Sequence, residues 1–243
     1  MLEHVISGIV KKPEKMLIYG EPGVGKSTLA SLCPKPIVVA TEDGVSHIDV
    51  DKFPTCKTYL SVKKVLQFLS SKQHFYETVV VDSLDWLEKL IWAAVCQENN
   101  CDSIADLGYG KGYKKAAAKV AEIISLLDKI VENGIHVVCI AHEKIEHVEN
   151  PETKDYHRHT PRLHNDANDL FTEWAYHVIF AYHKVIVKTE EGQWGSERGR
   201  GVGGQRFLRC NTKPGAVAKN RAGAPDDIAF DVEGTEFFKF FFK

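Results

Sequence analysis

The sequence predicts an α/β protein whose central sheet is mostly parallel and flanked by helices, with an antiparallel hairpin extension towards the C-terminal end. Apolar runs of strand length alternate along the chain with amphipathic helical stretches, which is typical of βαβ units. The runs are unbroken rather than alternating, as expected for strands that are covered on both faces. A glycine-rich turn joins the first run to the first helix.

The predicted strands and helices follow one another from residue 15 to residue 141. Helical spacing of apolar residues predicts helices from Ser27, over 60–69, from Leu84, and up to Asn133. The last of these follows a polar stretch, 97–112, and is expected to end before Gly134. The four strands are expected at 15–19, 36–41, 78–83 and 136–141, and the apolar face of the long helix at Ala117, Val120, Ile124, Leu127 and Ile130.

The remainder of the chain differs in character. Residues 143–169 are polar and rich in His, Asn and Pro, which indicates either a functional loop or a partly disordered segment. Residues 174–188 resemble a strand, and 192–204 contain six glycines, as expected for a mobile hairpin tip with 205–210 as the returning strand. The aromatic tail 233–243 is expected either to close against the core as a strand or to insert into a neighbouring subunit.

Composition limits the classes of protein that remain. The 243 residues, 44% of them hydrophobic, suffice for one sizeable α/β domain over 1–243, with mobile loops at about 100–113, 143–169 and 190–205. The net charge of −2 provides no overall attraction for nucleic acid, although 184–221 holds nine Lys or Arg against three Glu. Six cysteines without a C-x-x-C pair, no apolar signal core and no long apolar run predict a cytoplasmic protein without a membrane span.

The stretch 20–27 fits the phosphate-binding pattern G-x-x-x-x-G-K-[ST] at every fixed position. Glycines allow the tight turns that wrap backbone N–H groups around a phosphate, and the following helix directs its N-terminal dipole at the anion. Lys26 is expected to reach the β- and γ-phosphates, and the Ser27 hydroxyl to bind Mg²⁺. The nucleotide-binding residues are therefore predicted to be Gly20, Glu21, Pro22, Gly23, Val24, Gly25, Lys26, Ser27 and Thr28.

Three further side chains complete the predicted site. Asp82 ends a valine run on what we expect to be the strand adjacent to the loop strand, where it would hold Mg²⁺ together with Ser27. Glu42, at the end of the strand expected to intervene, is predicted to orient the attacking water, with Asp43 as its rival. His142 is expected to sense the γ-phosphate. Histidines between 142 and 164 raise the alternative of a zinc site, although no complete tetrahedral ligand set is present.

In these motifs the chain resembles the RecA-type recombinase core, and most closely the short phage-encoded relatives that act in single-strand annealing. The resemblance rests on 20–27, Glu42, 79–83, His142 and the segment 218–225, and it covers 15–231. Segment 218–225 resembles the K-N-K-x-x-x-P segment of RecA, so Lys219 and Arg221 are expected to act on the ATP of a neighbouring subunit. The chain departs from the RecA pattern in two respects. We expect no N-terminal docking helix, and His142 stands where RecA has a glutamine.

The resemblance also implies a single-stranded DNA surface on two loops near the axis of the assembly. Cations there would meet phosphates and aromatic side chains would stack on bases. Besides DNA, the implied partners are further copies of the chain, in a ring or filament with ATP between subunits, and a single-strand-binding protein. The candidate DNA-binding residues are Lys111, Tyr113, Lys114, Lys115, Arg158 and Arg162.

The sequence therefore predicts an ATP- and Mg²⁺-dependent RecA-like ATPase that binds single-stranded DNA and promotes strand annealing or recombination. One alternative is a ring-forming helicase or helicase-loader ATPase. Another, from a different class, is a nucleotide-dependent switch that acts through a protein partner, which the net acidic composition favours.

Overall fold

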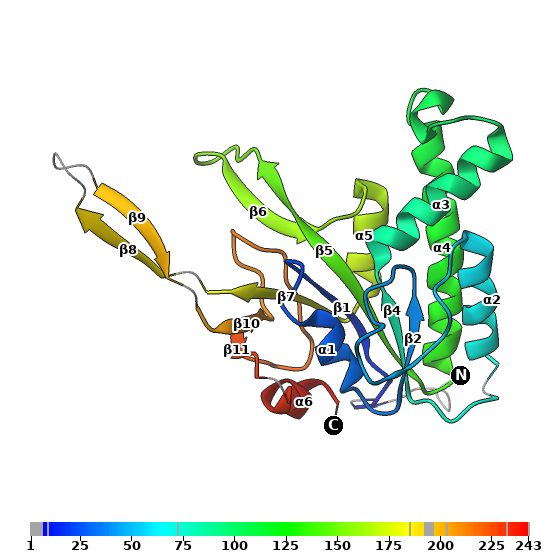
Figure 1. Cartoon of the computed structure of the whole chain (residues 1–243), viewed down its shortest axis with the longest axis horizontal. Coiled ribbons are helices and arrows are strands. Elements are labelled where there is room, and N and C mark those ends of the chain that lie inside the picture. Colours follow the sequence, from blue (N-terminus) through cyan, green and yellow to red (C-terminus); the bar gives the residue numbers. More distant parts are fainter. Residues whose placement is uncertain are drawn as a thin grey trace.

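The computed structural model describes residues 7–8, 10–71, 73–184, 186–191, 197–202, 204–231 and 233–242. A central mixed sheet forms the body of the molecule, and a separate two-stranded ribbon extends from it (Figure 1). The elements are, in chain order, β1 (Lys15–Gly20), α1 (Lys26–Ser31), β2 (Pro36–Ala40), β3 (Asp51–Lys52), α2 (Tyr59–Leu69), β4 (Thr78–Asp82), α3 (Leu84–Asn99), the 3₁₀ turn η2 (Ile104–Leu107), α4 (Lys111–Glu132), β5 (His136–Val148), β6 (Tyr156–Pro161), α5 (Asn165–Trp174), β7 (His177–His183), β8 (Ile186–Glu191), β9 (Glu197–Val202), β10 (Arg206–Arg209), β11 (Asp227–Ala229) and α6 (Thr235–Phe241).

The order of the strands in the sheet is β11-β10-β7-β1-β5-β4-β2-β3, with β6 paired to β5. The pairs from β7 to β3 are parallel, whereas β10 and β11 are antiparallel, so the predicted fold class is confirmed. The expectation that Asp82 ends a strand adjacent to the loop strand is wrong, because β5 lies between β1 and β4. Glu42 follows β2, which lies beyond β4 and does not intervene.

This order places His142 centrally. Gly20 pairs with His142 in β5, so the histidine lies beside the start of the phosphate loop and between that loop and Asp82. Parallel strands direct their carboxyl ends to one edge of the sheet, and ligands of such sheets gather there. The topology alone therefore brings β1, β5, β4 and β2 to one site.

Helices cover both faces of the sheet and create two cores. Val79 and Val81 of β4 belong to the core beneath α2, α3, α4 and α5, while Val80 belongs to the opposite core, with α1 and α6. Successive residues of a strand face opposite sides, so a strand buried on both sides has no face in contact with solvent. This two-sided burial explains the unbroken valine run.

Helix α4 ends as predicted, but its buried face is rotated from the predicted one. Asn133 closes the helix and Gly134 follows it with φ of +89°, a conformation that glycine adopts without strain. Ala117 and Ile124 lie at the border of the buried face and are only partly covered. The fully buried positions are Gly112, Ala116, Val120, Ile123, Leu126, Leu127, Ile130 and Val131.

The prediction of an irregular loop over 143–169 is wrong. Strand β5 continues to Val148 and pairs with β6 in an antiparallel hairpin, and α5 begins at Asn165. The hairpin projects beyond the body of the sheet (Figure 1), so much of it remains in contact with solvent and requires no apolar alternation. Trp174 likewise belongs to α5 and not to a strand, and β7 begins at His177.

The C-terminal region also corrects the prediction. The aromatic tail forms helix α6 rather than a strand, with Phe237 and Phe241 buried in the second core. Residues four apart share one face of a helix, which allows both rings to reach the same core. The strand predicted at 205–210 is β10, which pairs with β7, whereas β8 pairs with β9. Part of the glycine-rich tip, 192–196, lies outside the described residues.

Candidate nucleotide-binding site

The phosphate loop connects β1 to α1 in a geometry that requires glycine. Gly25 has φ of +103°, in the left-handed region, and ends the loop at the start of α1. Gly20 pairs so closely with β7 that a Cβ atom there would lie 2.0 Å from the Ala181 carbonyl oxygen. The loop therefore ends with its backbone N–H groups at the N-terminus of a helix, where anions bind.

Lys26 is held at the loop by backbone carbonyls. Its Nζ donates to the carbonyl oxygens of Gly20 at 2.9 Å and Glu21 at 2.8 Å, and the residue is 6% exposed. Burial lowers the pKa of Lys26, while the nearby carboxylates of Asp82 and Asp85 act in the opposite direction. An ammonium group that is desolvated beside an anion-binding loop is well placed to bind phosphate oxygens.

Ser27 and Asp82, the two predicted Mg²⁺ ligands, lie next to each other. The Ser27 hydroxyl donates to Asp82 Oδ2 at 2.6 Å, which brings together two of the oxygen ligands that Mg²⁺ prefers. Burial raises the pKa of Asp82, although the hydrogen bond from Ser27 opposes the shift. A bound cation would remove this penalty, so the pair fits a Mg²⁺ ion bound next to the phosphates.

Glu42, two residues after the end of β2, lines the same cavity. Its Oε1 accepts a hydrogen bond from the Ser83 hydroxyl at 2.7 Å, and Ser83 N in turn donates to Thr41 Oγ1 at 2.9 Å. Asp43 is exposed to solvent and does not line the cavity. The cavity has a volume of about 280 Å³ and is lined by Pro22, Gly23, Gly25, Lys26, Ser27, Thr28, Glu42, Gly44, His47, Ile48, Asp82, Ile140 and His142.

His142 is connected to a buried carboxylate that the sequence analysis did not identify. Asp85, 3% exposed, accepts from the His142 backbone N–H at 3.1 Å, lies 3.1 Å from His142 Nδ1, and accepts from Arg162 Nη2 at 2.6 Å. Burial alone would raise the pKa of Asp85, but the hydrogen bonds from His142 and Arg162 hold it well below its usual range. The only sequence signal was an acid in the first turn of the helix that follows Asp82.

Glu88, one helical turn further along α3, is a second buried acid. It is 8% exposed and accepts from the His164 backbone N–H at 2.9 Å. Burial raises its pKa to about 7, against the opposing effects of the His164 hydrogen bond and of Lys144. The pair Asp85 and Glu88 thus joins α3 to the segment between β6 and α5.

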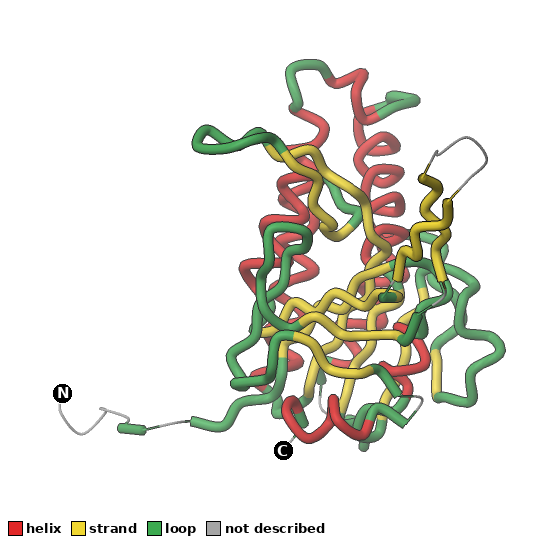
Figure 2. The backbone as a smooth tube through the Cα atoms, turned by 90° about the vertical axis from the view of Figure 1, so that its left-hand side faces the viewer, coloured by secondary structure: helices red, strands yellow, loops and turns green. Residues whose placement is uncertain are grey.

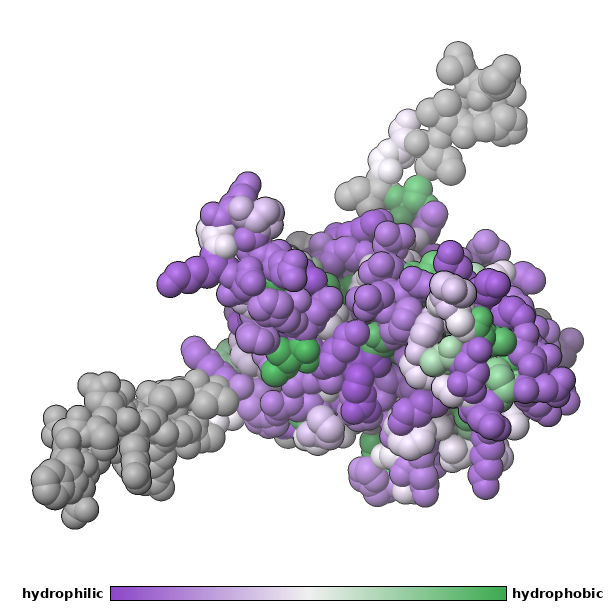
Figure 3. Space-filling view, turned by 90° about the horizontal axis from the view of Figure 1, so that it is seen from above, coloured by the Kyte–Doolittle hydropathy of each residue, from purple (hydrophilic) through white to green (hydrophobic). Residues whose placement is uncertain are grey.

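The predicted DNA-binding residues lie at one end of the molecule. The β5–β6 hairpin and the turn between α3 and α4 project at the same end in two perpendicular views (Figures 1 and 2). The surface at that end is mostly hydrophilic, with small apolar patches (Figure 3). Lys111, Lys114 and Lys115 are exposed there.

Some of these side chains have partners within the chain. The Tyr113 ring stacks on His164 at 4.2 Å, and Arg162 pairs with Asp85, whereas Arg158 lies 3.5 Å from Glu146. Tyr109, which the sequence analysis did not select, is 100% exposed in the glycine-flanked turn before α4. A tyrosine between two glycines was the available signal.

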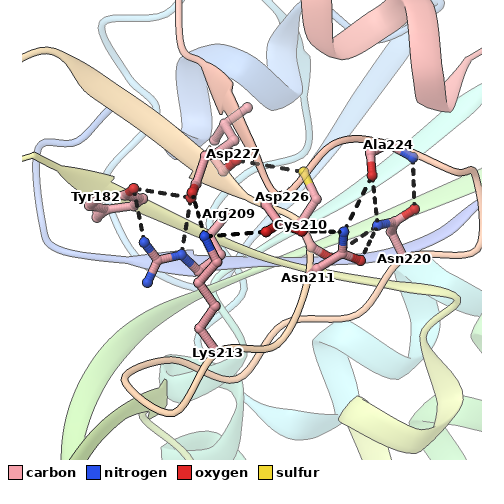
Figure 4. A network of polar contacts seen from close by, with 10 residues as sticks. Tyr182, Arg209, Cys210, Asn211, Lys213, Asn220, Ala224, Asp226 and Asp227 are labelled. Atoms are coloured by element: carbon pink, nitrogen blue, oxygen red, sulfur yellow. Dashed lines mark hydrogen bonds and ion pairs between the residues drawn. The ribbon is translucent and has the colours of Figure 1, made fainter.

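Lys219 and Arg221 lie towards the opposite end of the sheet. Lys219 pairs with Val178 near the start of β7, and its Nζ donates to the Thr172 carbonyl at the end of α5 at 2.6 Å. Asn220 fixes this segment by donating to Asn211 Oδ1 at 2.7 Å and accepting from the Ala224 N–H at 3.0 Å, within the network of Figure 4. The two cations therefore do not reach the phosphate loop of their own chain.

Two negative results concern the described residues. No group of three or more His, Cys, Asp or Glu in this part of the chain is arranged to hold a metal ion, so the histidine-rich segment gains no support as a zinc site. None of the described helices is both long enough and apolar enough to span a bilayer.

A parallel sheet with a phosphate loop after β1 and an acid at the end of a strand two positions away is the arrangement of a P-loop nucleotide-binding protein. Comparison with known proteins agrees with this class. A family model described as an AAA domain matches residues 12–222, and the chain belongs to that AAA-type P-loop ATPase family.

Two individual proteins are similar to the chain. The SPbeta prophage-derived uncharacterized protein YorG of Bacillus subtilis (strain 168) is 27% identical over 129 residues, which cover 51% of this chain but only 39% of that protein. The crystal structure of the flagellar accessory protein FlaH from Methanocaldococcus jannaschii has a TM-score of 0.47 and 11% identity, covering 90% of this chain and 85% of that one.

Proposed function

We propose that the protein is an ATP- and Mg²⁺-dependent ATPase that binds single-stranded DNA and promotes strand annealing or recombination. The observation that carries the ATPase part of this proposal is the convergence of Lys26, Ser27, Asp82, Glu42 and His142 on one cavity at the carboxyl edge of the sheet. This set contains a phosphate-binding cation, two oxygen ligands for a metal ion and a carboxylate for the attacking water.

Each side chain has a separate role in hydrolysis. Lys26 binds the β- and γ-phosphates. Ser27 and Asp82 would hold a Mg²⁺ ion, which would neutralise charge on the phosphates. Glu42 accepts a proton from the attacking water, in an orientation fixed by the Ser83 hydroxyl. His142 lies beside the phosphate loop and is the residue best placed to detect a γ-phosphate.

DNA binding is proposed at the end that carries the β5–β6 hairpin and the α3–α4 turn. Exposed Lys111, Lys114 and Lys115 supply charge for the phosphates, and Tyr109 offers a free ring for base stacking. The path His142–Asp85–Arg162 runs from the nucleotide cavity to the base of the hairpin. Through this path the bound nucleotide would change the affinity of the hairpin for DNA.

Assembly into a ring or filament completes the proposal. Lys219 and Arg221 lie away from their own phosphate loop, so among nucleotides bound at phosphate loops they would contact one held by another copy of the chain. Cations supplied by a neighbour stabilise charge on the transferred phosphoryl group.

The deciding experiment is the ATPase rate with and without oligo-dT, with Lys26→Ala as the inactive control. We expect stimulation by DNA, loss of turnover in Lys26→Ala, and a weaker response when Tyr109→Ala is tested. A normal basal rate that is indifferent to DNA would reject DNA binding while retaining the ATPase.

A normal basal ATPase rate that does not change with DNA would favour a nucleotide-dependent switch acting through a protein partner. Two features support this alternative. In the β5–β6 hairpin, Glu146 pairs with Arg158, and the whole chain has a net charge of −2. Such a surface attracts nucleic acid less strongly than a uniformly basic one.

A further inference from the structure

A second cavity lies at the amino edge of the sheet, at the end opposite the β5–β6 hairpin. Its volume is about 640 Å³, compared with about 280 Å³ at the phosphate loop, and it is within the range of small-molecule sites. Five segments form its walls. These are the N-terminal arm (residues 10–14), the start of β5, the start of β7, the segment after Asn220, and α6. The lining residues are Val10, Lys11, Lys12, Glu14, His136, Tyr176, His177, Arg221, Ala222, Phe240 and Phe241.

The charge of this cavity is positive. Lys11, Lys12 and Arg221 line it against a single carboxylate, that of Glu14. The Arg221 backbone N–H donates to His177 Nδ1 at 3.2 Å, so His177 Nε2 carries the proton that it donates to Glu14 Oε2 at 2.7 Å. Across the described part of the chain, no carboxylate forms an ion pair with any of the three cations.

Aromatic surface lies next to the cations. The Arg221 guanidinium lies 5.3 Å from the centroid of the Tyr176 ring, and the Phe241 ring packs edge-on against His177 at 4.8 Å. Arginine stacked on an aromatic ring keeps its N–H groups in plane and available to phosphate oxygens. Cations beside apolar aromatic surface are suited to a ligand that has both phosphates and a base.

Hydrogen bonds hold the backbone next to Arg221 and at Glu14. Asn220 holds the turn that carries Arg221, and the Glu14 backbone N–H donates to His136 Nδ1 at 2.9 Å. Lys11, Lys12 and Tyr176 also line an adjoining hollow of about 450 Å³, so the arm can be reached from both sides.

We propose that this cavity is a second site for the polyphosphate of a nucleotide, with Lys11, Lys12 and Arg221 as its phosphate ligands. The phosphates have two sources, a free nucleotide or one held by the phosphate loop of a second copy. In the latter case the site deepens the proposed function, because two lysines would act beside Arg221 on the neighbour's ATP.

The first test uses the full chain with Lys26→Ala, which disables the phosphate loop. Titration with a fluorescent ATP analogue is expected to show residual saturable binding. Adding Lys11→Ala, Lys12→Ala and Arg221→Ala should weaken that binding at least about tenfold, as expected when several charge-assisted contacts are lost. The matched control is Lys57→Ala with Lys64→Ala, two exposed lysines in and before α2, which should leave it unchanged.

The second test detects a nucleotide supplied by another copy. A chain with Lys11→Ala, Lys12→Ala and Arg221→Ala keeps an intact phosphate loop but lacks the three cations of the second cavity. The Lys26→Ala chain keeps these three cations but has a disabled phosphate loop. An equimolar mixture should hydrolyse ATP faster than the sum of the separate variants. Equal thermal unfolding midpoints would show that all variants are folded.

Residual binding in the first test, if the triple substitution weakens it, would show that the cavity binds free nucleotide. A mixture more active than the sum of the variants in the second test would show that it contacts the nucleotide of a neighbouring copy. Absence of both, or binding that is insensitive to the triple substitution, overturns the proposal. Neither test contains DNA, so failure here leaves DNA-stimulated hydrolysis intact, and failure of DNA binding leaves this site intact.

Discussion

At the scale of the residue, the position of Glu42 decides between two neighbouring acids. Glu42 lines the nucleotide cavity and is oriented by Ser83, whereas Asp43 is exposed. Adjacent acids after a strand are equivalent in sequence. Only the direction of each side chain distinguishes the carboxylate that lines the cavity, for which we propose the role of accepting the proton of the attacking water.

Glu42→Gln should preserve ATP binding and lower turnover by at least about 100-fold, because an amide cannot accept the proton of the attacking water. Single-turnover hydrolysis and nucleotide titration measure the two effects separately. Asp43→Asn is the matched control and should hydrolyse ATP at the normal rate. The reverse pattern would transfer the role to Asp43.

Glu88 predicts a pH dependence of stability. Burial raises its pKa from 4.5 to about 7 in the folded protein, so between these two pH values the folded state holds a proton that the unfolded state has released. Stability from this group is therefore fully present below about pH 4.5 and is lost as the pH rises through 7.

Urea unfolding between pH 5 and 8 should show this loss in the wild type and not in Glu88→Gln. The difference between the two proteins should change by up to about 3 kcal/mol across that window. Glu132→Gln, at an exposed position on α4, is the control and should follow the wild type. Parallel pH profiles for wild type and Glu88→Gln would contradict the assignment.

At the scale of the element, the β5–β6 hairpin is anchored by a polar contact between distant segments. Arg162, directly after β6, pairs with Asp85 of α3, and its backbone N–H donates to the His142 carbonyl at 2.8 Å. These contacts hold the hairpin to β5, the strand that passes beside the phosphate loop.

Arg162→Ala should destabilise the protein by about 2 kcal/mol, because it leaves the buried Asp85 carboxylate with one partner fewer. Asp85→Asn in the same chain should recover part of this loss, which a double-mutant cycle of urea unfolding would measure. We also expect the ATP dependence of oligo-dT affinity to weaken in Arg162→Ala. Strictly additive stabilities would show that the two side chains do not interact.

Helix α6 contributes to the core of its own chain. Phe237 and Phe241 are each 1% exposed, in contact with the face of the sheet that α1 also covers. Phe237→Ala should cost about 3 to 5 kcal/mol through lost burial and the cavity that remains. Thermal unfolding with light scattering is the measurement, and a change in assembly without a loss of stability would instead indicate an anchor in a neighbour.

At the scale of the whole molecule, the two ends of the sheet have different chemistry. The nucleotide cavity lies at the carboxyl edge, and Lys219 and Arg221 lie towards the amino edge. A head-to-tail assembly would bring these two ends together between adjacent copies.

Light scattering should therefore show larger particles with a non-hydrolysable ATP analogue and Mg²⁺ than without them. Arg221→Ala should lower both the particle mass and the ATPase rate, the rate by at least about tenfold. Lys129→Ala, on α4, is the control for a general effect of charge. A monomer at saturating nucleotide and DNA would exclude assembly.

The amino-acid sequence by itself determined the class of the fold and the chemistry of the phosphate loop. Unbroken apolar runs and the pattern at 20–27 are local features, fixed by burial on both faces and by the backbone freedom of glycine.

The tertiary structure alone decided the order of the strands, and with it the place of β5 between β1 and β4. It also paired Asp85 with Arg162, buried Glu88, turned the aromatic tail into a helix and gathered Lys11, Lys12 and Arg221 around one cavity. These contacts join residues far apart in the chain, and their free energy depends on neighbours that no local pattern of residues specifies.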